Sequence, residues 1–441
     1  MGVAQAHGAV VALRTLAVDF NSFFASCEQQ ERPELRGQPV GIVPVMADTS
    51  CVIAASYPAK ARGVKTGTGV AEARQLCPGI RLVEARPRVY IGYHHRLLDC
   101  IERCLHVSEV RSIDEVECAL TATFAPRERA LGVARQIKDT VRREVGPCLT
   151  SSIGIGPNWF LAKLATDLQK PDGLTVIEEA DLPQRLLDLQ IEDFLGIGPA
   201  MGPRLRAAGV DTVAKLYAAS AGQLRALWGN VEGERIYGRL RGQDIPSPST
   251  KHKTVGHSHV LPPNMRTVAK AHAVLHRLLQ KAAMRLRHSG HYAGGISAFI
   301  GYRDGARWAD DLRITETQDT LTLTTALNQL LAQPGAKQGR PVQVAVTLTR
   351  LLPMKGYTPE LFGQEQQEAR ERLNHAMDTL NQTFGHGSVY FGGAFGVTDN
   401  APMRISFTCI PKPEVEEIDP ARARRLRPPK PVPPPSESVA D

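Results

Sequence analysis

The sequence predicts a multidomain protein of mixed α/β and α+β class, and three observations support this prediction. The chain has 441 residues, which is too long for one hydrophobic core. Up to about residue 175, short apolar strands alternate with helix-periodic segments. Residues 254–352 then follow the order strand-helix-strand-strand-helix-strand, which is the ferredoxin-like arrangement. We therefore expect about two to four domains.

The first region is predicted to form a sheet covered by helices. Its first strand is TLAVDF (15–20), and further strands are expected in RPELRGQPVGIVPV, IRLVEA, VRSIDEVEC and SSIGIG. Helical periodicity covers residues 70–76, 90–104, 127–145 and 158–169. Strands and helices that alternate in this way favour a single layered domain.

Residues 183–242 are predicted to be helical, with no convincing strand. They contain LGIGPAMG (195–202), in which Gly196 and Gly198 have the spacing of a helix-hairpin-helix. Such glycines expose backbone N–H groups that bind phosphate without reading base sequence. An ordinary glycine-containing turn between helices is the alternative, and the string alone does not decide between them.

The second region is predicted to contain four strands and two helices. The strands are expected at 257–260, 295–302, 307–315 and 342–351, and the helices at 267–289 and 321–331. Basic residues gather at 251–259 and along the first helix, which could track a phosphate backbone or simply form a solvated face. A mixed extension covers 353–410, and the Pro-rich, charged segment 411–441 is predicted to be disordered.

Composition favours a cytoplasmic protein with a polyanionic partner. The net charge is +8, hydrophobic residues make up 42% and charged residues 22%. We identify no secretory signal and no membrane span, so no membrane partner is expected. The eight cysteines are scattered without a CxxC pair, as in a protein with reduced thiols.

Two neighbouring carboxylates, Asp114 and Glu115, interrupt the strand-like run VRSIDEVEC. Adjacent strand residues point to opposite faces, so a solvated hairpin edge is one interpretation of the pair. The other is a cation site, for which Asp19, at the end of the first strand, would supply a third carboxylate. Three carboxylates suit Mg²⁺, a hard cation that takes oxygen ligands.

The strings VDFNSFFASCE, AASYPAKARGVKTG, SIDE and SSIGIGPNWFLAKLATDLQKPDG occur in this order, and together they resemble the Y-family translesion DNA polymerases. NSFFASCEQ and AMDTLNQTFGHGSVYFGG look most similar to the bacterial UmuC type, the catalytic subunit of the SOS polymerase V. The resemblance covers residues 14–350 and extends more loosely to about 410.

The resemblance implies a right-hand polymerase that extends a primer past damaged template bases with the help of two Mg²⁺ ions. The implied domains are a palm at 14–48 and 73–175, fingers at 49–72, a thumb at 176–248 and a little finger at 254–352. The implied partners are primer-template DNA, dNTPs, the sliding clamp and SOS accessory subunits. The implied location is the bacterial cytoplasm, at the nucleoid.

The resemblance also implies roles for individual residues. The catalytic and metal-binding carboxylates would be Asp19, Asp114 and Glu115, with the backbone carbonyl of Phe20 as a further metal ligand. The Asp-x-Asp of many relatives is Asp19-Phe-Asn21 here, and the second position is not one of the three ligands. The nucleotide-binding set comprises Phe23, Phe24, Tyr57, Lys60 and Lys170.

Within that set, Phe24 would pack against the sugar of the incoming nucleotide and exclude a 2′-hydroxyl, whereas Phe23 should point into the palm core. A purely structural role for both rings is the alternative. TPELF (358–362) resembles the peptides that dock on the sliding clamp, with Leu361 and Phe362 as its anchors, although Thr358 stands where glutamine is usual.

Two other functions compete with a polymerase. A catalytically inactive DNA- and clamp-binding protein of the same fold would not need all three carboxylates. A nucleotidyl cyclase also places two-metal carboxylates on a palm-like sheet, but it gives no role to a helix-hairpin-helix or to a second ferredoxin-like domain. Primer extension with and without Mg²⁺ separates the three.

Overall fold

The computed structural model describes residues 13–246, 253–358, 364–385 and 387–400, together with residues 403, 405, 410 and 411. The chain divides into two compact units. The first unit comprises residues 1–250 and 405–410, and the second comprises residues 251–404 and 411–441.

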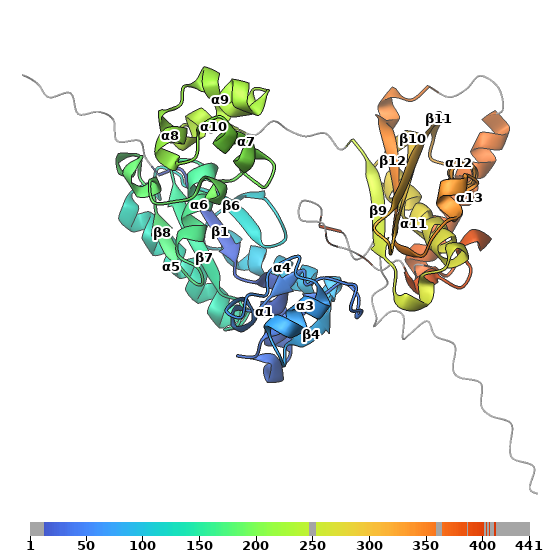
Figure 1. Ribbon diagram of the computed structural model, residues 1–441, viewed down its shortest axis with the longest axis horizontal. Helices are drawn as coiled ribbons and strands as arrows, with labels where there is room; N and C mark the ends of the chain where they lie inside the picture. Colours follow the sequence, from blue (N-terminus) through green and yellow to red (C-terminus); the bar gives the residue numbers. More distant parts are fainter. Residues whose placement is uncertain are drawn as a thin grey trace, which may run out of the picture. The chain divides into compact units, whose positions relative to one another are not determined.

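The first unit is built on a five-stranded sheet with the order β5-β6-β1-β7-β8 (Figure 1). Its strands are Val107–Val110, Glu115–Ala119, Thr15–Phe20, Ser151–Gly156 and Leu174–Val176, in that order. The central strands β1 and β7 are buried along their whole length, as their apolar sequences predict. β1 pairs antiparallel with both β6 and β7, so the end of β1 lies between the starts of its two neighbours.

Helices cover this sheet, and three of them lie close to the helical segments predicted from the sequence. They are α1 (Phe23–Glu31), α4 (Pro87–Glu102), α5 (Arg127–Glu144) and α6 (Trp159–Leu168). Helix α6 approaches β7 very closely, because a Cβ built on Gly154 would lie 2.0 Å from the carbonyl oxygen of Ala162. Only glycine fits there, and this close contact brings the side chains of α6 to the end of β1.

A second, three-stranded sheet has the order β3-β2-β4, and the predicted fingers segment 49–72 contributes to it. β2 (Val40–Val43) pairs antiparallel with β3 (Ala54–Ala55) and parallel with β4 (Arg81–Glu84), and α2 (Tyr57–Lys60) and α3 (Val70–Leu76) complete this module. The predicted range 49–72 contains β3, α2 and the start of α3, whereas β2 and β4 lie in the segments assigned to the palm. Parallel strands need a long crossover connection, so local sequence gave no indication that β2 and β4 are neighbours.

Short helices follow the five-stranded sheet and share a core with α6. They are α7 (Met201–Ala207), α8 (Val213–Ala218), α9 (Ala221–Trp228) and α10 (Glu232–Leu240). Phe160 and Leu164 of α6 pack in one cluster with Leu205, Leu216 and Leu224 of these helices. The predicted helical character of residues 183–242 is confirmed.

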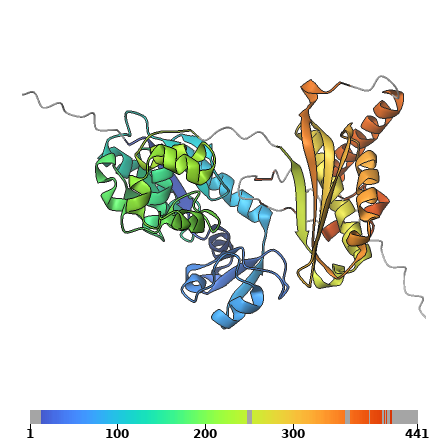
Figure 2. The same cartoon turned by 45° about the horizontal axis from the view of Figure 1, so that its top comes forward.

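The second unit has the predicted β-α-β-β-α-β order. Its elements are β9 (Val255–Val260), α11 (Val268–His288), β10 (His291–Tyr302), β11 (Arg307–Thr317), α12 (Thr320–Leu331) and β12 (Pro341–Pro353). The four strands pair antiparallel in the order β11-β10-β12-β9. Figures 1 and 2 show the helices gathered on one face of this sheet.

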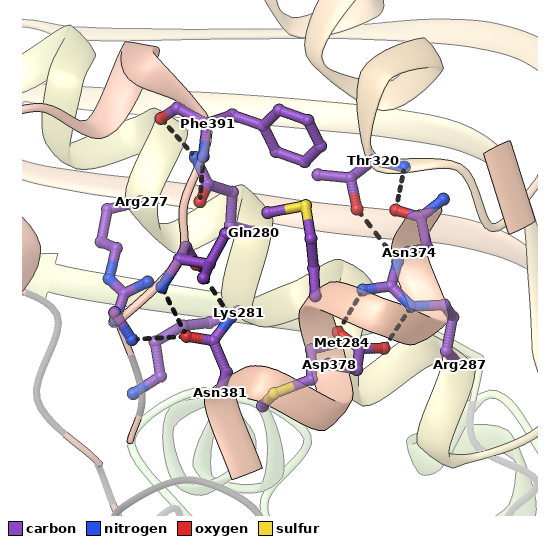
Figure 3. A pocket seen from close by; sticks show the side chains of 13 residues that line it. Arg277, Gln280, Lys281, Met284, Arg287, Thr320, Asn374, Asp378, Asn381 and Phe391 are labelled. Atoms are coloured by element: carbon purple, nitrogen blue, oxygen red, sulfur yellow. Dashed lines mark hydrogen bonds and ion pairs between the residues drawn. The ribbon is translucent and has the colours of Figure 1, made fainter. Parts of the chain in front are cut away.

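A further helix, α13 (Gln364–Phe384), packs against α11. Arg287 of α11 donates to both carboxylate oxygens of Asp378 at 2.6 and 2.8 Å, and Gln280 donates to the carbonyl oxygen of Phe391 (Figure 3). These contacts make residues 364–400 part of the second unit. The clamp residues Leu361 and Phe362 lie outside the described residues, and so does the predicted tail except for Pro411.

Candidate active site

The three predicted carboxylates line one cavity at the end of β1. Asp19 is paired with Glu115 across the β1–β6 ladder, and the backbone N–H of Phe20 donates to the carbonyl oxygen of Asp114 at 2.9 Å. Phe20, Phe24, Lys60 and Lys170 line the same cavity. The structure therefore brings together residues that lie far apart in the sequence.

The hairpin between β5 and β6 explains why two acids can be adjacent. The chain turns at residues 111–114, and β6 begins at Glu115. Asp114 therefore belongs to the turn, where strict alternation of side chains does not apply. Glu115 is the first strand residue, and both carboxylates reach the cavity.

Asp114 is the carboxyl group whose ionisation is most disfavoured. Burial, together with the nearby Asp19 and Glu115 carboxylates, raises the pKa of Asp114 to about 6, although the hydroxyl of Ser112, which donates at 2.7 Å, opposes this increase. Three crowded carboxylates, with the pKa of Asp114 raised, form a site that a bound cation would stabilise.

A lysine that sequence reasoning missed lies between two of these acids. The ammonium of Lys163, on α6, is 2.5 Å from Asp19 Oδ2 and 3.0 Å from Glu115 Oε1. Burial alone lowers the pKa of Lys163, but Asp19, Asp167 and Glu115 outweigh it and raise the pKa above its ordinary value. Lys163, Asp167 and Lys170 recur at helical spacing in LAKLATDLQK, and this pattern could have indicated a shared face.

Lys170 also contacts carboxylates, although the family resemblance implied only a nucleotide-binding role for it. Its ammonium is 2.8 Å from Asp19 Oδ2 and 2.8 Å from Asp167 Oδ1. In the described part of the chain, no three His, Cys, Asp or Glu side chains stand as a ready-made metal cluster. The two lysines instead supply the positive charge beside Asp19. The donor set, three carboxylates and a backbone carbonyl, nevertheless fits Mg²⁺, which prefers oxygen ligands.

The other basic residue of the predicted nucleotide set lies on α2. The ammonium of Lys60 is 4.7 Å from the centre of the Tyr57 ring. Lys60 and Lys170 line the same cavity, and burial together with the nearby Lys170 ammonium lowers the pKa of Lys60. Burial also raises the pKa of Tyr57, and Asp19 adds to that increase. Lys60 and Lys170 thus line the cavity of the carboxylates, and Tyr57 contacts Lys60.

The two phenylalanines differ in burial. Phe23 is 3% exposed and belongs to the core, although it reaches the wall of the cavity, whereas Phe24 is half-buried. The Phe24 ring stacks on Tyr90, which sequence reasoning also missed. The Tyr90 hydroxyl donates to Glu28 at 2.9 Å, and Arg86 donates to both oxygens of Glu28.

The glycines of the predicted helix-hairpin-helix form an open turn before α7. Gly196 has a φ of +90°, which favours glycine, and a Cβ at Gly196 or Gly198 would meet nothing within 4 Å. The carbonyl oxygen of Gly198 accepts from the N–H groups of Met201 and Gly202. The turn is therefore accessible on its outer side.

Comparison with known families decides the relationship. Residues 18–167 match the impB/mucB/samB family, and residues 252–361 match the C-terminal domain of that family. The chain belongs to this family. These are the Y-family DNA polymerases, so the resemblance drawn from the sequence motifs is confirmed at the level of the family.

Two bacterial relatives align with this chain over nearly their full length. DNA polymerase IV of Moorella thermoacetica is 35% identical over 393 residues, which is 86% of this chain and 96% of the relative. DNA polymerase IV 1 of Bacillus subtilis is 31% identical over 402 residues, with 88% and 95% covered. These names support the polymerase IV type and do not single out the UmuC type.

Solved structures of Y-family polymerases have the same fold as this chain. A chimera of the Y-family polymerases Dbh and Dpo4 matches with a TM-score of 0.66 at 23% identity, covering 77% of this chain and 100% of the chimera. An insertion ternary complex of Dbh DNA polymerase matches with a TM-score of 0.52 at the same identity and coverage. Within the described residues, no helix is long and apolar enough to cross a membrane.

Proposed function

We propose that this protein is a template-directed DNA polymerase of the polymerase IV-like translesion type, which adds dNTPs to a primer 3′ end. One observation carries this proposal: Asp19, Asp114 and Glu115 line one cavity with Lys60 and Lys170 in a chain of the Y-family. Carboxylates for cations beside lysines for phosphates are what nucleotidyl transfer requires.

The carboxylates of Asp19, Asp114 and Glu115 and the carbonyl of Phe20 would hold two Mg²⁺ ions. When bound, these ions activate the primer hydroxyl and neutralise charge on the reacting phosphates. The residues of the chain hold these ligands in position. Asp19 and Glu115 are placed by neighbouring strands of one sheet, and Asp114 is held by Ser112 and by the backbone of Phe20. Little reorganisation is then needed during the reaction.

The lysines would bind the triphosphate of the incoming nucleotide. Lys60 comes from the three-stranded module and Lys170 from the turn between α6 and β8, so a triphosphate bound between them would contact both parts of the unit. Lys163 would balance the carboxylates before nucleotide and metal arrive, and would release Asp19 and Glu115 as cations enter. Phe24 would contact the sugar.

The domain roles follow from this assignment. The five-stranded sheet with α4, α5 and α6 would be the palm, and the three-stranded module the fingers. The helices from 176 onward would be the thumb, and the strand-helix region 254–352 the little finger. The partners would be primer-template DNA, dNTPs and, through residues 358–362, the sliding clamp. A cytoplasmic location at the nucleoid follows from these partners.

A UmuC-type enzyme is the more specific alternative that the sequence motifs suggest. It rests only on NSFFASCEQ and AMDTLNQTFGHGSVYFGG, and the names of the bacterial relatives favour polymerase IV instead. An enzyme of the UmuC type would be expected to depend on accessory subunits, so activity of the isolated chain would favour the polymerase IV type.

Primer extension on a defined template tests the proposed function. We expect nucleotide addition with Mg²⁺ and none after chelation. An inactive accessory protein would bind the primer-template but not extend it, and a cyclase would consume a nucleoside triphosphate without a template. Either result would overturn the proposal.

A further inference from the structure

The turn at residues 170–173 is held by a lysine that has no role in the reaction described above. Lys138 of α5 donates to the backbone carbonyl oxygens of Ser151, Asp172 and Gly173 at 2.7, 2.8 and 3.2 Å. The same ammonium is 2.7 Å from Asp172 Oδ1, and only 19% of the Lys138 side chain is exposed. A lysine has three N–H donors, so the four acceptors use its full capacity and at least one N–H is shared.

The same turn is held from the opposite side by Asn21, two residues after Asp19. Asn21 is 2% exposed, and its Oδ1 accepts from the N–H of Asp172 at 2.8 Å and from the hydroxyl of Thr150 at 3.2 Å. Its Nδ2 donates to the hydroxyl oxygen of Ser152 at 3.0 Å. An ionised aspartate accepts but cannot donate, so the amide matches this set of partners.

Asp172 itself has an unfavourable backbone conformation. Its φ is +58°, in the left-handed region that non-glycine residues seldom adopt. The N–H, the carbonyl oxygen and the carboxylate of Asp172 are all bound, by Asn21 or by Lys138. These contacts stabilise a turn that would otherwise relax.

The turn matters because it begins with Lys170. The ammonium of Lys170 lies 2.8 Å from Asp19 Oδ2, inside the cavity of the carboxylates. The position of Lys170 therefore depends on the backbone of residues 171–173, and through it on α5 and on the end of β1.

We propose that Asn21 and Lys138 are positioning residues that hold the 170–173 turn so that Lys170 faces the triphosphate of the incoming nucleotide. This inference rests on the proposed polymerase function. Neither residue is expected to touch the substrate.

Steady-state insertion of one dNTP, with DNA affinity and thermal melting measured in parallel, tests this proposal. We expect Lys138→Met and Asn21→Leu each to raise the KM for dNTP by about tenfold, with a smaller change in kcat and no change in DNA affinity. Asn21→Asp keeps the two acceptor contacts and should remain within about threefold of the parent.

Coupling to Lys170 separates a positioning role from a general loss of stability. If Lys138 acts through Lys170, the double variant Lys138→Met/Lys170→Ala should be no worse than Lys170→Ala alone. Arg142→Met is the matched control, because Arg142 lies on the same helix but reaches only Asp172 Oδ2, at 3.7 Å, and is largely exposed. Its KM should stay within about twofold of the parent.

The inference is overturned if Lys138→Met keeps the parental KM, or if its effect adds in full to that of Lys170→Ala. If Lys138→Met does not fold, Asn21→Leu tests the same turn from the other side. An inactive parent protein would instead contradict the proposed function, so the two failures are distinguishable.

Discussion

The ring of Phe24 stacks on the ring of Tyr90, with centroids 4.5 Å apart and an angle of 16° between the planes. Tyr90 is fully buried, and its hydroxyl is tied to Glu28, which is itself bound by Arg86. Phe24 is thus backed by a buried, hydrogen-bonded ring, and in its proposed role it would not move aside for a larger sugar. A ring held in this way excludes groups by overlap rather than by hydrogen bonding.

Phe24→Ala should therefore raise ribonucleotide insertion by about a hundredfold or more, while deoxynucleotide insertion falls modestly. The measurement is single-nucleotide insertion of matched dNTP and rNTP on one template. Phe23→Ala is the control, because Phe23 is buried, and its main effect should be a loss of about 3–5 kcal/mol of stability. An unchanged sugar preference in Phe24→Ala would place the gate elsewhere.

Asp114→Ala should lower the rate of nucleotide addition by about a thousandfold or more, because it would remove a ligand from the proposed metal site. Affinity for the primer-template, measured by fluorescence anisotropy, should remain close to that of the parent. Activity within about tenfold of the parent would contradict the assignment of Asp114.

Asp114→Asn should also stabilise the metal-free protein at pH 8. Because the folded-state pKa of Asp114 is raised to about 6, the stability that its protonated form contributes is complete below about pH 4 and is lost as the pH rises through 6. A neutral amide avoids this loss, so Asp114→Asn should melt at a higher temperature in chelator. The difference should shrink at pH 4 and on addition of Mg²⁺, and a lower melting temperature at pH 8 would refute this account.

The burial of His94 predicts that the folded protein loses stability in acid. It is 3% exposed, and its Nδ1 lies 2.8 Å from the carbonyl oxygen of Ile113, beside the turn that carries Asp114. Burial lowers the pKa of His94 to about 4, so its neutral form stabilises the fold above pH 6.5, and this stability is lost as the pH falls from 6.5 towards 4.

His94→Gln keeps a neutral donor and should weaken the pH dependence of unfolding by up to about 3 kcal/mol between pH 7 and 4. Denaturant unfolding of parent and variant at both pH values measures the difference. Parallel pH profiles for the two proteins would show that His94 does not carry the effect.

Replacing Gly196 and Gly198 by alanine should weaken DNA binding regardless of base sequence, because side chains would keep the backbone amides from phosphate. Binding of the parent should fall steeply with salt, and the double variant should show a shallower dependence. Gly209→Ala is the matched control, since Gly209 also has a positive φ and open space but lies beyond α7. Equal affinity for the double variant and the Gly209→Ala control would leave Gly196–Gly198 as a plain turn.

The sequence predicts the elements of the fold well because their periodicity is local. The strands around Asp19 and Glu115 and the long helix α11 lie within a few residues of their expected positions. The convergence of the three carboxylates was also predictable, from strand ends and from family motifs. By contrast, the parallel pairing of β2 with β4 depends on which strands meet after the crossover, and no local pattern encodes that choice.

The side-chain contacts of the site were the least predictable part. Lys163 could have been suspected from its helical spacing, but Tyr90 and Lys138 are ordinary helix residues in the sequence. Their roles depend on packing between segments that are remote along the chain: Tyr90 on Phe24, and Lys138 on the turn after α6. Such contacts become visible only once the helices are placed on the sheet.

Helix α6 packs both against the five-stranded sheet and against the helices that follow it, and this affects how the first unit unfolds. One side of α6 lies on β7 through Gly154, and Phe160 and Leu164 help to form the core of the following helices. The five-stranded sheet and those helices should therefore unfold as one cooperative block. The three-stranded module has its own small core around Val52 and Ala59, so its backbone amides should exchange with solvent at a lower free energy, which hydrogen exchange can measure. Lys60 would then approach the triphosphate from the more labile part of the molecule and Lys170 from the more stable one.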